Sequence, residues 1–175
     1  MVEIFSVNDL YTGIHIMEDF TIKHSPLGGN GLFAEKNFPK NTVLMRLDGI
    51  KLTRKEAFDM PGNNGDNLLQ IGKDLYLDFT GKSHLFINHS CAPNSFVKVY
   101  VNTGFLMSAI PIHKDDEILI DYSLTSLETN NEWNMNCNCG VYGCRKVISG
   151  YDSLTDDKKA RYKELGMIQD FILKG

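Results

Sequence analysis

The stretch FINHSCAPNS, residues 86–95, combines an apolar start, an Asn-His pair, a cysteine and a turn-forming end. Its cysteine, Cys91, is the only one outside NCNCGVYGC, residues 136–144, where three cysteines have C-x-C-x₄-C spacing. This spacing is typical of metal sites, but a closed structural zinc site needs four ligands. If Cys91 packs against the second stretch, the four cysteines complete such a site. A buried inert Cys91, a histidine as the fourth ligand, and cysteines without a metal stay open as alternatives.

The length and composition of the chain indicate one soluble globular domain with a short appendage. Of its 175 residues, 42% are hydrophobic and 23% are charged, which is ordinary for such proteins. No apolar stretch approaches the roughly 20 residues needed to span a bilayer, and the first residues do not resemble a secretory signal. We therefore expect a protein of the cytoplasm or nucleus, not secreted and without a membrane partner. Its clustered cysteines are then expected to be metal ligands or catalytic thiols rather than disulfides.

The net charge bears on the class of partner. At a formal charge of −4, general nucleic-acid binding is not expected, because neutralising phosphates requires a basic surface. The charge is compatible with a basic protein or peptide as partner. The sequence gives no signal for an oligomeric state.

Short alternating segments separated by turn residues predict a mainly β protein with a minor helical part. The segments with strand patterns are 20–25, 31–38, 41–49, 67–72, 75–81, 95–112 and 116–123. Hairpin turns are predicted at Gly72-Lys73-Asp74 and at Asn102-Thr103-Gly104.

Two segments carry helix signals. Residues 53–60 have room for two helical turns, and a longer helix is predicted over 155–166, with two aspartates in its first turn and Gly166 as a C-cap. Trp133 is expected to pack in the core or at its rim. An apolar stripe predicts that the C-terminal region docks on the domain, and its members are Tyr162, Leu165, Ile168 and Phe171.

The chain carries, in order, the motifs GGNGLFAEKNF (28–38), FINHSCAPNS (86–95), DDEILIDYS (115–123) and CNCGVYGCRKVI (137–148). Together they resemble the glycine, Asn-His, Asp-Tyr and post-SET motifs of SET-domain protein lysine methyltransferases. The resemblance implies a SET-domain fold of several short β-sheets, in which the Asn-His and Asp-Tyr segments meet in a knot-like crossing. It also implies a division into an N-terminal segment (1–19), a SET domain (20–124), a post-SET-like zinc segment (125–148) and a C-terminal helical appendage (149–175).

The resemblance also bears on the cysteines. In this family a cysteine of the Asn-His motif joins three post-SET cysteines on one structural zinc. The implied zinc ligands are therefore Cys91, Cys137, Cys139 and Cys144.

The glycine motif does not fit a dinucleotide-binding fingerprint. Such a fingerprint needs a third glycine that opens a helix, whereas the stretch after Gly31 reaches Pro39 without a helical pattern. Glycines also let a backbone approach a ligand closely, and by resemblance that ligand is S-adenosylmethionine. Asn88 can offer it both a donor and an acceptor. The implied cofactor-binding residues are Gly29, Asn30, Gly31, Leu32, Phe33, Phe86, Asn88 and His89.

Tyr122 follows Asp121 in the Asp-Tyr motif, and the resemblance implies that it is the catalytic residue. Methyl transfer from a sulfonium to an amine is an in-line displacement, so alignment supplies much of the acceleration. The lysine must arrive neutral although its free pKa is about 10.4, and an apolar channel helps by lowering that pKa. A tyrosine hydroxyl at the channel floor can orient the amine and the methyl group through weak C–H···O contacts.

Four positions depart from the family pattern. Leu85 stands where the family often has an arginine, and aromatic residues usual in the family are replaced by Leu47, by Leu68 or a neighbour, and by Ile120. The implied lysine channel is therefore aliphatic. An aliphatic channel can desolvate an amine but offers no cation–π contact. We therefore expect an S-adenosylmethionine-dependent methyltransferase that acts on a lysine of a protein or peptide substrate. A catalytically inactive, zinc-stapled SET-like module that binds a protein partner is the alternative, and a thiol redox protein is a third possibility.

Overall fold

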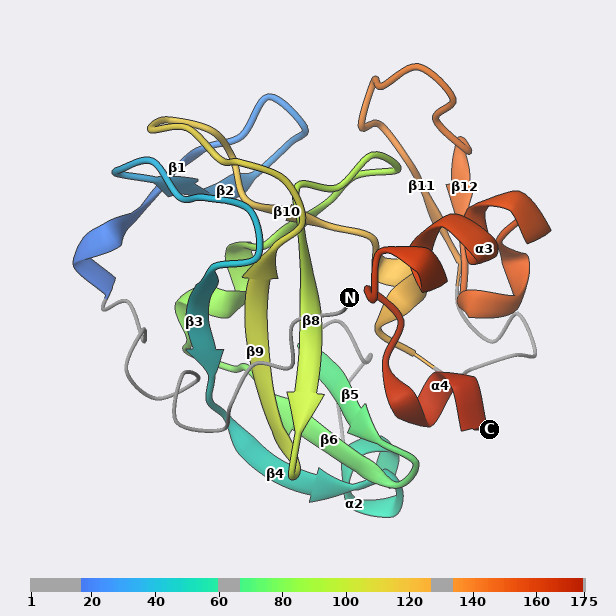
Figure 1. The fold of residues 1–175 in the computed structure, drawn as a ribbon. Helices are drawn as coiled ribbons and strands as arrows, with labels where there is room; N and C mark the ends of the chain where they lie inside the picture. The colour runs from blue at the N-terminus through green and yellow to red at the C-terminus, as the bar shows by residue number, and fades with distance from the viewer. Residues whose placement is uncertain (1–16, 60–66, 127–133, 175) are drawn as a thin grey trace.

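The computed structural model describes residues 17–59, 67–126 and 134–174. Trp133 and most of the predicted N-terminal segment lie outside these residues, so the expectations for them stay predictions. Within the described residues the strands form two three-stranded and three two-stranded sheets (Figure 1). The protein is thus mainly β with several small sheets, as the sequence predicts.

Two antiparallel three-stranded sheets form the larger part of the fold. The first sheet has the strand order β3 (Val43–Leu47), β9 (Thr103–Ser108), β8 (Ser95–Tyr100). The second has the order β4 (Ile50–Thr53), β6 (Leu75–Asp78), β5 (Leu68–Gly72). The expected short helix is α2 (Arg54–Asp59), which follows β4. Side chains of both sheets share one core, which includes Leu47, Leu69, Leu77 and Leu106. Burial of such side chains, at about 1.5–3 kcal/mol each, holds the two sheets together.

The glycine motif lies on β2 (Asn30–Ala34), which is paired on both edges. One edge pairs antiparallel with β1 (Phe20–His24). On the other edge, the backbone N–H of Ile118 donates to the carbonyl of Leu32 at 2.7 Å. The glycine motif therefore lies beside the segment that leads into the Asp-Tyr motif.

The Asn-His and Asp-Tyr motifs meet in the one parallel strand pairing among the described residues. Here β7 (Asn88–His89) pairs with β10 (Leu119–Ile120). The backbone N–H of Ser90 extends the pairing by donating to the carbonyl of Ile120 at 2.9 Å. Parallel neighbours need a long connection, and the β8–β9 hairpin lies within it. The two motifs thus come together as the family resemblance implies.

The C-terminal region lies along one side of the β domain (Figure 1). Its elements are β11 (Met135–Asn136), β12 (Val147–Ile148), α3 (Asp156–Glu164) and α4 (Asp170–Lys174). The side chain of Thr155 caps the start of α3 by accepting from the N–H of Lys158. Gly166 follows its end with a φ of 67°, and the N–H of Met167 returns to the carbonyl of Tyr162 at 2.9 Å, as in a Schellman motif. The predicted helix and its terminal glycine are confirmed. No helix in the described ranges is long and apolar enough to cross a bilayer.

The predicted apolar stripe docks on the β domain except at one position. Tyr162 and Ile168 are buried in a second hydrophobic cluster with residues of β9, and Phe171 packs against it. Leu165 is 41% exposed, so the prediction was wrong there. The helical spacing on which the stripe rests stops at Glu164, because the chain turns into a left-handed conformation after Leu165.

Several predicted strands were longer than the observed ones, and one hairpin turn was misplaced. The β8–β9 turn consists of Val101 and Asn102, with φ of 45° and 58°, so it comes one residue earlier than predicted and resembles a two-residue type I′ hairpin. The last predicted strand pairs with β2 over its first residues and with β7 over β10, and its pairing ends there. It stops because the carboxylate of Asp121 accepts from the N–H of Ser123 at 3.1 Å and starts a 3₁₀ turn, η3 (Tyr122–Leu124).

Candidate functional site

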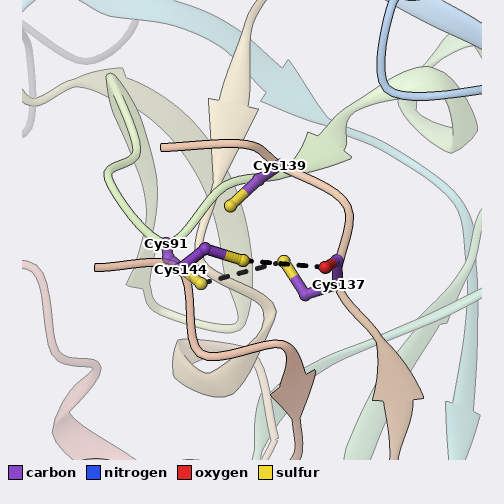
Figure 2. A group of neighbouring side chains, drawn as sticks. All are labelled: Cys91, Cys137, Cys139 and Cys144. Atoms are coloured by element: carbon purple, nitrogen blue, oxygen red, sulfur yellow. Dashed lines mark hydrogen bonds between the residues drawn. The ribbon is translucent and has the colours of Figure 1, made fainter. Parts of the chain in front are cut away.

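All four cysteines come together where the Asn-His segment meets the C-terminal region (Figure 2). Their Sγ atoms lie within 4.8 Å of one another, and those of Cys91 and Cys137 are 3.8 Å apart. Tetrahedral zinc with Zn–S bonds of about 2.3 Å holds its sulfur atoms about 3.8 Å apart. The cluster of Cys91, Cys137, Cys139 and Cys144 therefore fits a four-thiolate zinc site, and Cys91 is not isolated from the other three.

Hydrogen-bond donors surround the sulfur of Cys91. The backbone N–H and the Nε of Arg145 lie 3.4 and 3.3 Å from it, and His89 Nε2 lies 3.4 Å away. Such donors stabilise a thiolate, which is the form that binds a metal. Burial raises the pKa of the Cys137 thiol to about 12, whereas at Cys139 burial is outweighed by hydrogen bonds with the backbone of Cys91 and Val141, which lower the pKa to about 6. Ionisation of Cys137 near pH 7 therefore requires a compensating cation.

His89 connects the cysteine cluster to the Asp-Tyr motif. Its Nδ1 accepts the backbone N–H of Tyr122 at 3.1 Å, so in the neutral ring the proton is on Nε2, which faces the sulfur of Cys91. Burial lowers the pKa of His89 to about 4 and keeps the ring neutral near pH 7. One side chain thus holds both a candidate metal ligand and the backbone of the candidate catalytic residue.

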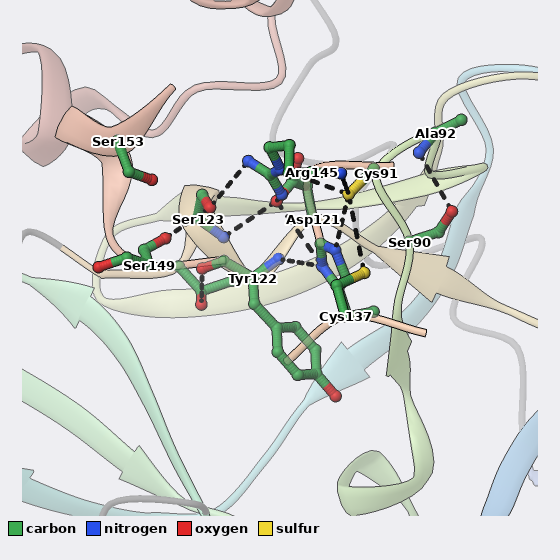
Figure 3. Close-up of polar contacts among 12 residues, drawn as sticks. Ser90, Cys91, Ala92, Asp121, Tyr122, Ser123, Cys137, Arg145, Ser149 and Ser153 are labelled. Carbon is green, nitrogen blue, oxygen red and sulfur yellow. Dashed lines mark hydrogen bonds and ion pairs between the residues drawn. The ribbon is translucent and has the colours of Figure 1, made fainter. Parts of the chain in front are cut away.

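A buried ion pair holds the residues on either side of Tyr122 (Figure 3). The Asp121 side chain has no exposed surface, and its Oδ1 lies 2.6 Å from Arg145 Nη2. Arg145 Nη1 donates to Ser123 Oγ at 3.0 Å, and Ser123 Oγ donates to the carbonyl of Ser149 at 2.6 Å. Tyr162 of α3 completes the network by donating to Asp121 Oδ2 at 2.8 Å.

This network gives roles to two residues that the motifs did not assign. Arg145 directly follows the last cysteine, which was the only sequence signal for it, and Tyr162 was expected only as an apolar docking residue. Burial, and the neighbouring Asp121 carboxylate, raise the pKa of Tyr162 well above its usual value, so its hydroxyl stays a donor. The C-terminal helix therefore reaches directly into the polar centre of the fold.

Replacing Tyr162 with phenylalanine is expected to lower the free energy of unfolding by about 2 kcal/mol. A hydrogen bond to a charged group contributes about 1.5–3 kcal/mol, and the lost donor leaves Asp121 Oδ2 buried without its partner. Urea denaturation measures the change. Tyr151→Phe is the control, because Tyr151 is a half-buried tyrosine of the C-terminal region. It packs against the second hydrophobic cluster, which contains Tyr162. Equal effects of the two substitutions would contradict a role for the Tyr162 hydroxyl.

Tyr122 points its ring away from the ion pair (Figure 3). Its hydroxyl donates to the carbonyl of Ile87 at 2.8 Å, and its ring centroid lies 5.3 Å from that of His89. The phenol oxygen is thus held in place through its proton and keeps lone pairs for weaker contacts. The ring packs against the main core, which includes Leu47 and Ile120, two of the positions where the sequence departs from the family pattern.

The structure brings part of the expected cofactor site together. Asn88 Nδ2 donates to the carbonyl of Asn30 at 3.0 Å, so the Asn-His and glycine motifs are in direct contact. The Leu32 side chain is fully buried, so only its backbone can serve a ligand. Gly29 has a φ of 64° in the turn before β2, and Phe86 packs against the main core. The binding roles of these residues, and of Gly31, Phe33 and His89, stay predictions.

Comparisons with known proteins agree with this arrangement. A family model described as the SET domain matches residues 29–123. Histone-lysine N-methyltransferase 2D of Homo sapiens is 28% identical over 139 residues, which are 73% of this chain and 2% of that protein. The H3 lysine-4 specific histone-lysine N-methyltransferase of Aspergillus oryzae is 30% identical over 132 residues, which are 68% of this chain and 11% of that protein. The chain thus spans a small part of the length of these relatives.

A solved structure shows the same fold. SUVH6 of Arabidopsis thaliana, crystallised in complex with SAM, superimposes with a TM-score of 0.66 at 21% identity, over 79% of this chain and 34% of that one. The chain belongs to the SET-domain family of protein-lysine methyltransferases. Its four-cysteine cluster near the C-terminus is consistent with the post-SET segment of that family.

Proposed function

We propose that this chain is an S-adenosylmethionine-dependent methyltransferase that modifies a lysine side chain of a protein. The observation that carries the proposal is the parallel pairing of β7 with β10, which places the Asn-His motif beside the segment that leads to Tyr122. The bond from Asn88 to Asn30 adds the glycine motif. Three motifs that are far apart in the sequence are therefore adjacent, which supports one shared site.

In this proposal the cofactor lies against the glycine motif, Phe86, Asn88 and His89. When bound, it supplies a methyl group on a positively charged sulfur. The backbone from Gly29 to Phe33 offers its polar groups, because glycines in the motif permit a close approach. Asn88 and His89 are held rigidly by their neighbours, so little side-chain entropy is lost when a ligand binds.

The role of Tyr122 in this proposal is alignment. The bond to the Ile87 carbonyl fixes the phenol oxygen, so it can orient an incoming amine and the methyl group without reorganising. Leu47 and Ile120 are buried in the core on which the Tyr122 ring packs. An apolar surrounding of this kind disfavours a charged ammonium and favours the neutral amine that is the nucleophile.

The zinc that we assign to the four cysteines is structural. With four thiolate ligands its coordination is closed, so no position remains for a water or a substrate. Its contribution is to hold residues 137–146 against the Asn-His segment, where Arg145 reaches Asp121.

For the substrate we propose a lysine of a basic protein. The similar proteins are named as histone-lysine methyltransferases, and the net charge of −4 favours a basic partner. A histone places the protein in the nucleus, and a non-histone substrate is compatible with the cytoplasm. We propose for the domain organisation the division at residues 19, 124 and 148 that the motifs imply.

The proposal is tested by titrating the zinc-loaded protein with S-adenosylmethionine and S-adenosylhomocysteine in a calorimeter. We expect micromolar affinity and one zinc per chain. Labelled cofactor is then incubated with recombinant histones, and transfer to lysine is located by mass spectrometry. A folded, zinc-loaded protein that binds neither ligand would rule the proposal out.

A catalytically inactive module that binds a protein partner is the second candidate. The aliphatic residues at 47, 68 and 120 favour it, since they cannot supply the hydrogen bonds or cation–π contacts of the aromatic residues usual there. Cofactor binding without transfer to any histone or lysate protein, together with retained histone affinity, would favour this candidate over the enzyme.

A further inference from the structure

The side chain of Glu117 lies in the contact between the glycine and Asn-His motifs and belongs to neither. Residue 117 forms a β-bridge with Phe33 of β2, which directs the half-buried carboxylate toward Asn88. One oxygen, Oε1, accepts from Asn88 Nδ2 at 2.7 Å, and the other, Oε2, accepts from Ser25 Oγ at 2.9 Å. The carboxylate is therefore held at both ends.

Gly31 makes room for this carboxylate. A Cβ atom built on Gly31 would lie 2.2 Å from Glu117 Oε1, far inside van der Waals contact. The observed position of the Glu117 carboxylate is thus compatible with glycine at residue 31 and not with a larger residue. An alanine there would push Glu117 away from Asn88.

The bonds of Asn88 determine which of its polar atoms is available to a ligand. Its Nδ2 donates to Glu117 Oε1 and to the carbonyl of Asn30. Both partners can only accept, so the nitrogen must face them, and this fixes the orientation of the amide. Both N–H donors are used inside the protein. Within the described part of the chain, Oδ1 of Asn88 has no hydrogen-bond donor, so it is an acceptor held ready for a ligand.

We propose that Glu117 is a positioning residue that aims Asn88 Oδ1 at the ammonium of the amino acid headgroup of the cofactor. This inference rests on the proposed function. An adenine edge needs a donor as well as an acceptor, and the side chain of Asn88 has no donor left, whereas an ammonium needs acceptors only. The negative charge of Glu117 behind the amide also favours a cation in front of it.

The test compares two ligands that differ in the headgroup. S-adenosylhomocysteine carries the ammonium, and 5′-methylthioadenosine has the same nucleoside without the amino acid. In Glu117→Ala we expect the Kd for S-adenosylhomocysteine to rise about tenfold, as for the loss of one well-placed hydrogen bond, with the Kd for 5′-methylthioadenosine changed less than about twofold. In Glu117→Gln, which keeps a carbonyl acceptor for Asn88, we expect most of the affinity for S-adenosylhomocysteine to return.

Three further measurements make the result decisive. Glu35→Gln removes a half-buried carboxylate that directly follows β2 and pairs with Lys23, and it is expected to bind both ligands like the wild type. Ser25→Ala removes the other anchor of Glu117 and is expected to shift the same Kd by a few-fold, even if Glu117→Ala fails to fold. Circular dichroism and zinc content check the fold of each variant.

The outcomes separate this inference from the proposed function. Equal weakening of both ligands in Glu117→Ala, or no weakening of either, overturns the positioning role and leaves the proposed function standing. A Glu117→Gln variant as weak as Glu117→Ala also overturns it, because the acceptor at Asn88 is then not what matters. If the wild type binds neither ligand, the proposed function fails, and this inference fails with it.

Discussion

Replacing Cys91 with serine is expected to remove stoichiometric zinc and to release the segment that contains the other three cysteines. Loss of a metal ligand should weaken zinc binding by more than about 100-fold, because even partners outside the coordination sphere contribute 10–100-fold. Zinc content after dialysis against a chelator measures the loss. Hydrogen exchange should rise over residues 134–149, since Cys137 N–H bonds to the carbonyl of Lys146 at 2.7 Å within the loop that the metal would hold.

Asn138→Ser is the matched control for this experiment. Asn138 is exposed and stands between two of the proposed ligands, so the substitution changes the same loop without touching a sulfur. We expect it to keep one zinc per chain and wild-type exchange. Full zinc retention in Cys91→Ser would show that the metal is held without this residue, and the four-cysteine assignment would have to be abandoned.

Replacing Tyr122 with phenylalanine is expected to lower turnover on the order of 10²-fold while cofactor binding stays within about threefold. The hydroxyl is proposed to align the amine and the methyl group. A misplacement of the reacting groups by about 1 Å costs about 10²-fold in rate. The variant also loses the bond to the Ile87 carbonyl, at a cost of about 1 kcal/mol in stability. Transfer of labelled methyl to the identified substrate measures turnover, and calorimetry with S-adenosylhomocysteine measures binding.

Tyr100→Phe is the control, because Tyr100 is a half-buried tyrosine on β8 that packs against Phe105, outside the proposed site. It should fold and turn over like the wild type. If Tyr122→Phe were as active as this control, the phenol oxygen would have no part in the transfer, and alignment would have to come from backbone groups.

Much of the fold could be predicted because its signals are local. The glycine, Asn-His, Asp-Tyr and cysteine motifs each occupy a short stretch, and their order alone identified the family. The meeting of all four cysteines followed from the same resemblance, since Cys91 was the only candidate for a fourth thiolate. Strand lengths were less predictable, because Asp121 ends its strand through a side-chain bond to the backbone of Ser123, and an alternating pattern carries no sign of that.

The contacts between motifs could not be predicted in the same way. Arg145 and Tyr162 reach Asp121 from sites 24 and 41 residues away, and nothing near either residue in the sequence indicates a buried carboxylate as its partner. Glu117 carries no sequence signal of its own, because a single acidic residue in a short strand is usually solvated. Its role emerges only when β2 places Gly31 beside it. Contacts of this kind depend on register, which is decided by the whole sheet rather than by one segment.

The bond between Tyr162 and Asp121 has a consequence for how the protein matures on the ribosome. The Asp-Tyr segment leaves the exit tunnel well before residues 145 and 162, which supply the cation and the hydroxyl that its buried carboxylate needs. A buried carboxylate without its partner is destabilising by about 3–5 kcal/mol, so this segment should stay open while the rest of the β domain can already pack. The nascent polypeptide is therefore expected to order the Asp-Tyr segment only when α3 emerges and folds back.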